Sequence, residues 1–322
     1  MDDALRLSRA MSYKNAMADL PFGGGKAVLF GIGVSDRREL VECYAGWLNS
    51  LGGRFCTGED AGFSIEDCDS LQRFSRFVAG TTAGAGDPAQ YTAEGVFYGM
   101  QAAVAWRLKR QTLEGVRVAV QGVGSVGWRL CRLLRDAHAQ LLVADTNEKR
   151  ARDASREFGA EIVPVAEIAV SPVDIFAPCA LGGVITEAVA EQITAKIVAG
   201  CANNQLQTKF AGTILHHRET LYAPDFVINA GGLLSGAEEL AKIAGVALRL
   251  DGSLHSRLYR IHPRLLDIFR SSARQDLPPE QIAEQRAREI LTNRAARRMG
   301  RNETSALRGS AVSTTNDLRG LE

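Results

Sequence analysis

The sequence predicts an α/β protein whose centre is a parallel, doubly wound sheet. Between residues 116 and 231, short β-branched or apolar runs alternate with helical segments, which is the pattern of βαβ units. A glycine-rich turn, "GVGSVG", joins the first of these runs to the first helix. The chain has 322 residues, and single cores rarely grow beyond roughly 250–300 residues. We therefore expect a second α/β domain and a cleft between the two.

The region before residue 88 predicts that other domain. Leu5, Leu7 and Met11 have helical spacing, and Pro21 with the following glycines stops the helix. The stretch "TTAGAGDPAQ" predicts a domain boundary near residue 88. The elements expected before it are a helix over 3–19, a short buried strand over 26–30, a helix over 36–53, and over 53–62 a strand that runs into a polar loop.

The region from residue 89 to 275 predicts the sheet domain. A long helix over 91–110, with a face of small residues suited to close packing, comes first. The elements expected after it are strands over 116–121, 140–145, 160–163, 173–178, 195–200 and 225–231, helices over 128–138, 148–157 and from about 184, and a helical part from 255. We expect a C-terminal helix over 276–299 to return to the first domain. Residues 300–322 are polar and without periodicity, which predicts a disordered tail.

Composition excludes several classes of protein. Hydrophobic residues make up 46% of the chain and the net charge is +1, so nothing favours a nucleic-acid or membrane surface. No apolar run approaches the roughly 18–20 residues that span a bilayer, and the N-terminus is unlike a signal peptide. The six cysteines are scattered without a Cys-x-x-Cys pair. This predicts reduced thiols in a cytoplasmic protein and no metal site.

Gly122-x-Gly124-x-x-Gly127 is the candidate cofactor-binding motif. Glycine turns are common, but this one lies between a predicted strand and a predicted helix. Gly122 allows the tight turn, Gly124 lets the backbone approach a pyrophosphate, and Gly127 lets the helix pack against the strand. Ser125 and Val126 begin that helix, whose N–H groups and dipole favour phosphates. A non-binding turn is the alternative.

Asp145 is the candidate for selecting the cofactor. It ends the next predicted strand, near the expected distance of about 20 residues, and Thr146 follows it. Its carboxylate would accept hydrogen bonds from ribose hydroxyls and repel a 2′-phosphate, which favours NAD over NADP. Lys149 and Arg150 are close and could support some NADP binding.

Seven segments resemble the leucine/phenylalanine/valine dehydrogenase branch of the amino-acid dehydrogenase family, which includes glutamate dehydrogenases and similar tryptophan dehydrogenases. They run in family order from residue 3 to about 232. The segments are "DALRLSRAMSYKNAMADLPFGGGKAV", "GRFCTGEDAG", "TAEGV", "VAVQGVGSVG", "DIFAPCALGGVIT", "IVAGCANNQL" and "YAPDFVINAGG". The resemblance implies a Rossmann-type NAD-binding domain over 89–275, a substrate domain over 1–88, and a homo-oligomer.

The resemblance also implies roles for single residues. Lys26 matches the catalytic lysine, Asp60 the aspartate that shuttles protons with it, and Lys14 the lysine that binds the substrate carboxylate. Asn204 matches a position that holds substrate and ribose, with Asn203 as the alternative. On the cofactor side, the matching residues are Thr92 and Asn229 near the nicotinamide carboxamide, with Cys179, Ala180 and Asn203 beside the cofactor.

Elementary chemistry supports these roles. Oxidative deamination needs a hydride acceptor, a cation for the carboxylate, and a base that activates water against the imine. A lysine is that base only if burial and a neighbouring cation lower its pKa. Lys14 can supply part of this repulsion to Lys26. The glycines at 23–25 then leave room for backbone and substrate beside Lys26.

The chain departs from the family at its N-terminus. Family chains start some tens of residues earlier, with a segment that supplies the first strands and a loop lining the substrate pocket. Here Met1 falls almost at the helix that carries Lys14. A catalytically impaired NAD-binding relative is therefore the rival of an active amino-acid dehydrogenase, although the presence of Lys14, Lys26 and Asp60 favours the enzyme.

Three residues predict the substrate. Leucine-preferring relatives tend to carry alanine at Gly58 and phenylalanine-type ones glycine, and aliphatic-specific relatives tend to carry valine at Gly236. Two missing side chains predict a larger pocket and a slight preference for aromatic over branched aliphatic amino acids. Leu233 could refill the space. Gly236 also lacks the polar group that glutamate dehydrogenases use for the side-chain carboxylate.

Overall fold

A parallel sheet forms the centre of the larger region, as predicted. The computed structural model describes residues 2–30, 36–60, 62–84 and 87–313. Within them the six strands lie in the order β3-β2-β1-β4-β5-β6, the order of a Rossmann fold. Their bounds are β1 Arg117–Gln121, β2 Gln140–Ala144, β3 Glu161–Ile162, β4 Ile175–Pro178, β5 Ile197–Val198 and β6 Leu221–Tyr222.

Helices cover both faces of the sheet. Successive residues of a strand point to opposite faces, so neighbouring residues belong to different core clusters. Val118 and Val120 belong to the same core cluster as residues of α4 and α5. Ala119, between them, belongs to the cluster formed with η1, α7 and α8. The central strands are thus buried on both faces, which explains their near-continuous apolar sequence.

The helices account for most of the chain, and several have visible capping signals. Asn147 caps α6 by accepting from the N–H of Lys149, and Gly159 ends that helix in the left-handed conformation. The bounds are α1 Asp2–Met17, α2 Arg37–Ser50, α3 Ile65–Gln72, α4 Ala89–Arg107, α5 Ser125–Asp136, α6 Glu148–Phe158, η1 Ile168–Val170, α7 Glu187–Gln192, α8 Lys209–His217, α9 Asp225–Ile228, α10 Gly231–Ala244, α11 Leu254–Tyr259, α12 Ile261–Gln275 and α13 Pro279–Ser313. Among the described residues, no helix has both the length and the apolar character needed to cross a bilayer.

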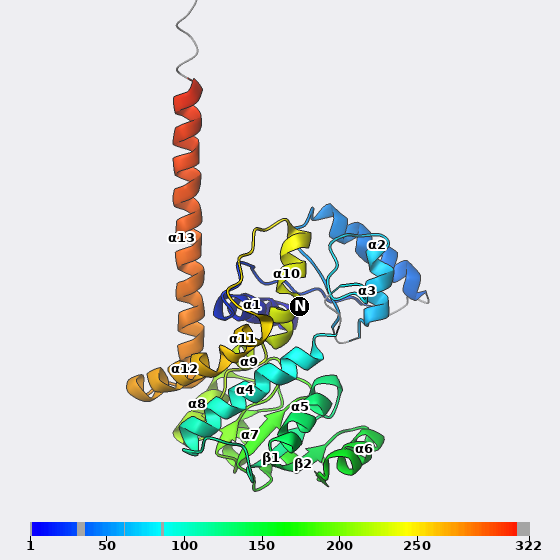
Figure 1. Cartoon of the computed structure of the whole chain (residues 1–322), viewed down its shortest axis with the longest axis vertical. Helices are drawn as coiled ribbons and strands as arrows, with labels where there is room; N and C mark the ends of the chain where they lie inside the picture. The colour runs from blue at the N-terminus through cyan, green and yellow to red at the C-terminus, as the bar shows by residue number, and fades with distance from the viewer. Residues whose placement is uncertain (1, 31–35, 61, 85–86, 314–322) are drawn as a thin grey trace, which may run out of the picture.

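The residues before α4 form most of a second region, called here the smaller region. It lies on the side of α4 away from the sheet. Helices α1, α2 and α3 gather there with α10 (Figure 1). Its own core includes Tyr44, Leu48 and Leu71. Helix α4 packs closely against its neighbours, since a Cβ on Gly99 would collide with Ile228 of α9. The predicted face of small residues therefore has the packing role expected of it.

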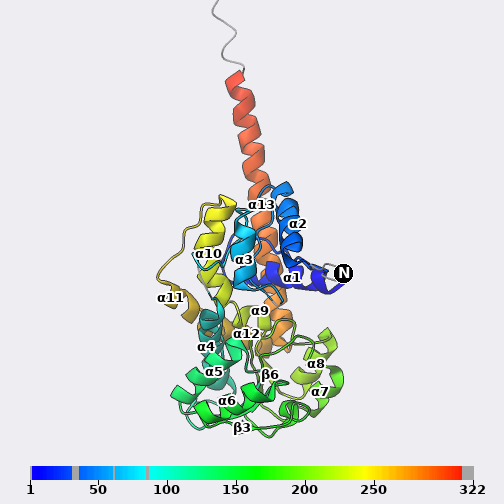
Figure 2. The same ribbon diagram turned by 90° about the vertical axis from the view of Figure 1, so that its right-hand side faces the viewer.

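Helix α13 returns to the smaller region. Arg288 Nε donates to the hydroxyl of Tyr13 on α1 at 3.0 Å, and an Arg294 N–H donates to the carbonyl of Leu20 at 2.6 Å. The helix then continues to Ser313 and projects beyond the rest of the molecule (Figures 1 and 2). Residues 300–313 are therefore helical and not the disordered tail predicted, because the segment contains no proline to end the helix. Residues 314–322 lie outside the described part of the chain.

Three predicted strands are wrong. Residues 26–30 form no regular element. Val28 and Phe30 are 52% and 75% exposed, whereas Ala27 and Leu29 pack against the core that contains Leu48. Residues 53–60 contain only isolated bridges, such as the one between Thr57 and Val78. Residues 225–231 contain the helix α9 and the start of α10, and the strand lies earlier, at β6. A short apolar run does not distinguish strand from helix, and only pairing with a neighbour makes it a strand.

Candidate active site

The glycine-rich turn after β1 has the geometry that the motif predicts. Gly122 has a φ of +96°, which is strained for any residue with a side chain. A Cβ on Gly127 would collide with the carbonyl oxygen of Gly122, so the helix packs directly on the turn. At Gly124, by contrast, no atom lies within 4 Å of the Cβ position. The backbone of Gly124 is therefore open to close approach from outside the protein on the side of its Cβ position.

The start of α5 faces this open space. Gly124 is the N-cap residue in an extended conformation, and it supplies no side-chain acceptor to the first turn. Ser125 and Val126 follow it, and the hydroxyl of Ser125 accepts from Arg129 at 2.8 Å. The first-turn N–H groups and the helix dipole favour an anion here.

Asp145 lies beside the same turn. Its Oδ2 accepts from the N–H of Val123 at 2.9 Å, and its Oδ1 accepts from the N–H of Asn147 at 2.8 Å. The carboxylate thus holds the turn after β1 against the loop after β2, where Thr146 is exposed. Each oxygen has further lone pairs that a ribose hydroxyl could use.

The side chains of Lys14, Asn203 and Asn229, which come from three distant segments of the chain, are joined by hydrogen bonds. Lys14 Nζ donates to Asn203 Oδ1 at 3.0 Å, and Asn229 Nδ2 donates to the same oxygen at 2.8 Å. Asn229 also donates to the carbonyl of Cys201 at 3.0 Å. Its Oδ1 is buried and has no hydrogen-bond partner, which is uncommon. An amide donor such as a nicotinamide carboxamide would satisfy it, so this position fits the predicted cofactor.

Lys14 is in an unusual electrostatic environment. It is only 7% exposed, and burial lowers its pKa to about 8. The negative charge of Asp225 opposes this shift, whereas the positive charge of Lys26 contributes to it. The positive charge of Lys26 thus adds to the effect of burial on Lys14.

Lys26 forms an ion pair with Asp60. Their side chains are 24% and 47% exposed, so the pair is accessible. Two of the three glycines before Lys26 leave room for neighbouring parts of the protein, and at Gly24 this is the predicted close approach of backbone. A Cβ on Gly24 would collide with the backbone of α1 at Ser8, and one on Gly25 would collide with the ring of Phe55. The room that these two glycines leave is thus filled by the protein itself.

The remaining predicted cofactor residues lie around the turn or at the start of α4. Ala180 packs on the turn, since a Cβ on Gly122 would lie 2.8 Å from the Cβ of Ala180. The N–H of Cys179 donates to the carbonyl of Gln121 at 2.8 Å. Thr92 donates to the carbonyl of Pro88 at 3.0 Å and lies beside the start of α10.

The predicted substrate residues are less uniform. Asn204 has a φ of +50°, and its carbonyl accepts from the N–H of Gly183; Asn203 and not Asn204 contacts Lys14. A Cβ on Gly58 would lie 3.1 Å from the carbonyl oxygen of Ala79, so its absence relieves a backbone contact. At Gly236 the Cβ position is open, and Leu233 packs on the main core.

Sequence reasoning missed Asp225, which acts electrostatically on Lys14. The available signal was the dipeptide Pro224-Asp225, because proline followed by an acidic residue is typical of a helix start. A strand prediction over 225–231 gives this carboxylate no role, whereas in the structure it lies at the start of α9.

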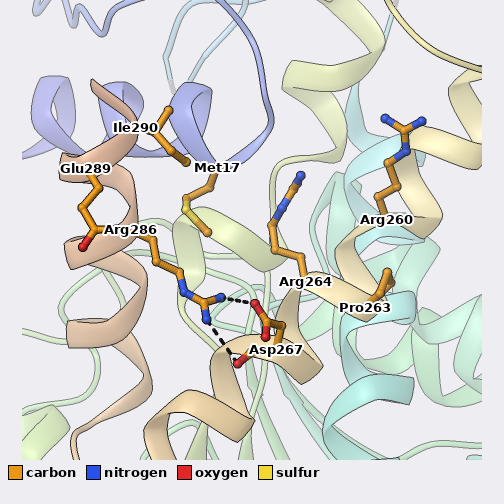
Figure 3. A pocket seen from close by; sticks show the side chains of 8 residues that line it. All are labelled: Met17, Arg260, Pro263, Arg264, Asp267, Arg286, Glu289 and Ile290. Carbon is orange, nitrogen blue, oxygen red and sulfur yellow. Dashed lines mark hydrogen bonds and ion pairs between the residues drawn. The ribbon is translucent and has the colours of Figure 1, made fainter. Parts of the chain in front are cut away.

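A cavity of about 640 Å³ lies elsewhere, between α1, α12 and α13 (Figure 3). It is lined by Met17 and three arginines, of which Arg264 and Arg286 have carboxylate partners and Arg260 donates to the carbonyl of Asp251. Arg286 donates to Asp267 at 2.6 Å, and Arg264 donates to Asp19 at 2.5 Å. None of the predicted catalytic or cofactor residues lines this cavity. The open surface at Gly124 and the site of Lys14 and Lys26 remain the better candidates for the cofactor site and the catalytic site.

Comparison with known proteins identifies relatives of the whole chain. Residues 138–276 match the Glutamate/Leucine/Phenylalanine/Valine dehydrogenase family, and residues 1–73 match the Glu/Leu/Phe/Val dehydrogenase dimerisation domain. Leucine dehydrogenase of Thermoactinomyces intermedius is 39% identical over 295 residues, which cover 90% of this chain and 79% of the relative. Phenylalanine dehydrogenase of Bacillus thermotolerans is 40% identical over 249 residues, covering 74% of this chain and 65% of the relative.

A solved structure agrees with the sequence relatives. The crystal structure of L-tryptophan dehydrogenase from Nostoc punctiforme is 38% identical and superimposes with a TM-score of 0.75. The match covers 92% of this chain and 84% of that chain. The similarity therefore extends over both the sheet region and the smaller region.

Proposed function

The chain belongs to the glutamate/leucine/phenylalanine/valine dehydrogenase family of NAD(P)-dependent oxidoreductases, and from that premise we propose that it catalyses the reversible, NAD-dependent oxidative deamination of an apolar L-amino acid. The products are the 2-oxo acid and ammonia. The observation that carries the proposal is the Lys26–Asp60 ion pair together with the buried Lys14, on which the charge of Lys26 acts. One cation for a carboxylate and one lysine–carboxylate pair for proton transfer are what this reaction requires.

Lys14 binds the substrate carboxylate by a charge-assisted hydrogen bond. Asn203 holds the Lys14 ammonium in place, and this contact favours Asn203 over Asn204 as the residue that acts on substrate. Asp60 first takes the ammonium proton of Lys26, with which it is paired. The neutral amine of Lys26 then takes the proton from the water that attacks the imine carbon, and Asp60 returns its proton later in the reaction. Bound NAD supplies the hydride acceptor.

The residues at the turn would hold the cofactor. Gly124 and the first turn of α5 bind the pyrophosphate, and Asn229 binds the carboxamide through its unpartnered Oδ1. Asp145 accepts from the ribose hydroxyls and repels a 2′-phosphate, which favours NAD over NADP. Lys149, the rival residue, is paired with Asp153 at 2.7 Å, and this supports the assignment to Asp145.

The side chain of the substrate is apolar, with a slight preference for aromatic over branched aliphatic. The named relatives at 38–40% identity act on leucine, tryptophan and phenylalanine. The open Cβ position at Gly236 supports a large pocket. Gly58 supports it less, because its missing methyl would point at the backbone of Ala79 and not into free space.

We also propose that residues 1–88 form the substrate domain, that residues 89–275 form the cofactor domain, and that the protein is a homo-oligomer. The match of residues 1–73 to the family's dimerisation domain supports the last point. The contacts of α13 with α1 support the return of the C-terminal helix to the substrate domain.

Reduction of NAD and of NADP, measured against phenylalanine, tryptophan, leucine, valine and glutamate, tests the proposal. We expect NAD reduction with the apolar amino acids and the highest kcat/KM for an aromatic one. A clear preference for leucine or valine would show that Leu233 fills the space beside Gly236. NADH binding without turnover of any amino acid would identify the impaired relative instead.

A further inference from the structure

Asp225 is a half-buried carboxylate that contacts the loop of Asn203 by a hydrogen bond to the N–H of Gln205. We propose that Asp225 is a positioning residue, which fixes the loop that presents Asn203 to Lys14 and supplies the negative charge behind Lys14. This inference rests on the proposed function, since it assigns Lys14 to the substrate carboxylate.

The hydrogen bonds of Asp225 reach into two segments. Oδ2 accepts from the N–H of Gln205 at 3.1 Å, and Oδ1 accepts from the N–H of Phe226 at 2.6 Å. The backbone N–H of Asn204 also favours the charged form of Asp225. The carboxylate therefore binds the two residues that directly follow Asn203.

The other end of this loop is held by Gln205. Its Nε2 donates to the carbonyl of Gly200 at 2.9 Å and to that of Ala202 at 3.0 Å. Asn203 lies between these contacts, and its Oδ1 accepts from Lys14 and from Asn229. Because Asp225 holds the backbone on the far side of Asn203, its loss would release the side chain that orients Lys14.

The charge of Asp225 is the second part of the argument. Burial raises the pKa of Asp225, whereas the backbone donors and Lys14 favour its carboxylate. Three ionisable groups affect the pKa of Lys14: Asp225, Lys26 and Cys201. Asp225 and Cys201 raise this pKa, and Asp225 has the larger effect of the two. Tyr222 and Glu280 are further groups on which Asp225 acts. Lys14 thus depends on Asp225 to stay charged despite its burial.

A purely structural role would give a different result. Asp225 begins the four-residue helix α9, and an acidic residue there stabilises a helix start. Loss of that effect alone would lower stability but would leave the ionisation of Lys14 unchanged. The ionisation of Lys14 is therefore the measurement that separates the two roles.

The variants are Asp225→Asn and Asp225→Glu, with Asp174→Asn as the matched control. Asp174 precedes β4 at the opposite end of the sheet, accepts from the N–H of Arg117 at 3.1 Å, and lies 3.6 Å from Lys196. It is thus also a carboxylate that holds backbone beside a lysine. Folding of each variant is verified by thermal unfolding.

The first measurement is the pH dependence of Lys14 acetylation by acetic anhydride, followed by mass spectrometry of the protein without substrate. In Asp225→Asn we expect the midpoint to move about one unit or more below that of the wild type, since loss of a nearby opposite charge lowers a lysine pKa. Asp225→Glu keeps the charge and should keep the midpoint. A midpoint in Asp225→Asn equal to that of Asp174→Asn would overturn the proposal.

The second measurement is the KM of the amino acid against pH. In Asp225→Asn we expect KM to rise about tenfold, with a smaller change in kcat, and its increase at alkaline pH to begin at lower pH. Asp225→Glu should restore the pH dependence but not the full affinity, because the loop is displaced. If the wild type turns over no amino acid, the proposed function fails, and the acetylation experiment still decides whether Asp225 controls Lys14.

Discussion

The two halves of the candidate site are encoded in different ways. The glycine-rich turn and Asp145 come from one βαβ unit, and the hydrogen bond that joins them, from Val123 to Asp145, spans 22 positions. The lysine site is assembled from segments far apart, since Lys14 and Asn203 are separated by 189 residues. Lys26 lies in a segment without regular structure. The cofactor half is therefore a local structure, whereas the substrate half depends on how the two regions pack.

Gly127→Ala is the strongest test of the local half. The added Cβ would collide with the carbonyl of Gly122, and backbone cannot move aside as a side chain can. We expect loss of NADH binding and destabilisation of about 1–3 kcal/mol, measured by fluorescence titration and chemical denaturation.

Gly46→Ala is the matched control in the smaller region. Gly46 lies within α2, and its Cβ position is open. The same substitution there should stabilise the helix by up to about 1 kcal/mol and leave NADH binding unchanged. Equal damage by both substitutions would contradict the role of the turn.

Glu280 tests how a buried carboxyl group affects the fold at the start of α13, the helix that returns to α1. It is buried, neither carboxyl oxygen has a hydrogen-bond partner, and burial raises its pKa to about 7. Because the pKa of Glu280 is higher in the folded than in the unfolded state, this group stabilises the folded state at pH values below its unfolded pKa. That contribution is lost as the pH rises through 7. Glu280→Gln should therefore be more stable than the wild type at pH 8, by up to about 3 kcal/mol, and similar to it at pH 5.

Chemical denaturation at both pH values measures this difference. Glu284→Gln, on the same helix, removes partly exposed ion pairs with Lys209 and Arg288. It should change stability by less than about 1 kcal/mol at either pH. A Glu280→Gln variant that is no more stable than the wild type at pH 8 would show that the buried carboxyl is not penalised.

Asp145→Asn should have a smaller effect than Gly127→Ala, because the amide keeps the shape of the side chain and one of its two backbone hydrogen bonds, to Val123 or to Asn147. Loss of the charge removes the repulsion of a 2′-phosphate, and we expect the ratio of NADPH to NADH dissociation constants to fall about tenfold. Asp153→Asn, at the exposed partner of Lys149, is the control and should leave the ratio unchanged. A wild type that already prefers NADPH would show that Asp145 does not select the cofactor.

The same contrast explains what the sequence could predict. The strands β1 and β2, the turn and Asp145 follow from alternation and spacing within one unit, and the structure agrees with each. The run over 26–30 has the composition of a strand, but a strand also needs a partner, and composition does not supply one. The run after Pro224 was read as a strand because periodicity over so few residues does not exclude a helix.

The lysine site could be predicted only in part. The resemblance named Lys14, Lys26 and Asp60, but spacing alone could not place Asn203 on Lys14. The glycines at 23–25 are predicted to leave room for backbone and substrate; at Gly24 the backbone of α1 occupies that room, and at Gly25 the ring of Phe55 does. Such contacts depend on packing between distant segments, which no local pattern contains.

The most direct test of the account measures both turnover and the NADH dissociation constant in the single variant Lys26→Ala. Lys26 and Asp60 act on the substrate side, separate from the glycine-rich turn. The account predicts that turnover is abolished while the dissociation constant of NADH stays within about twofold of the wild type. Retained turnover, or an equal loss of NADH binding, would contradict it.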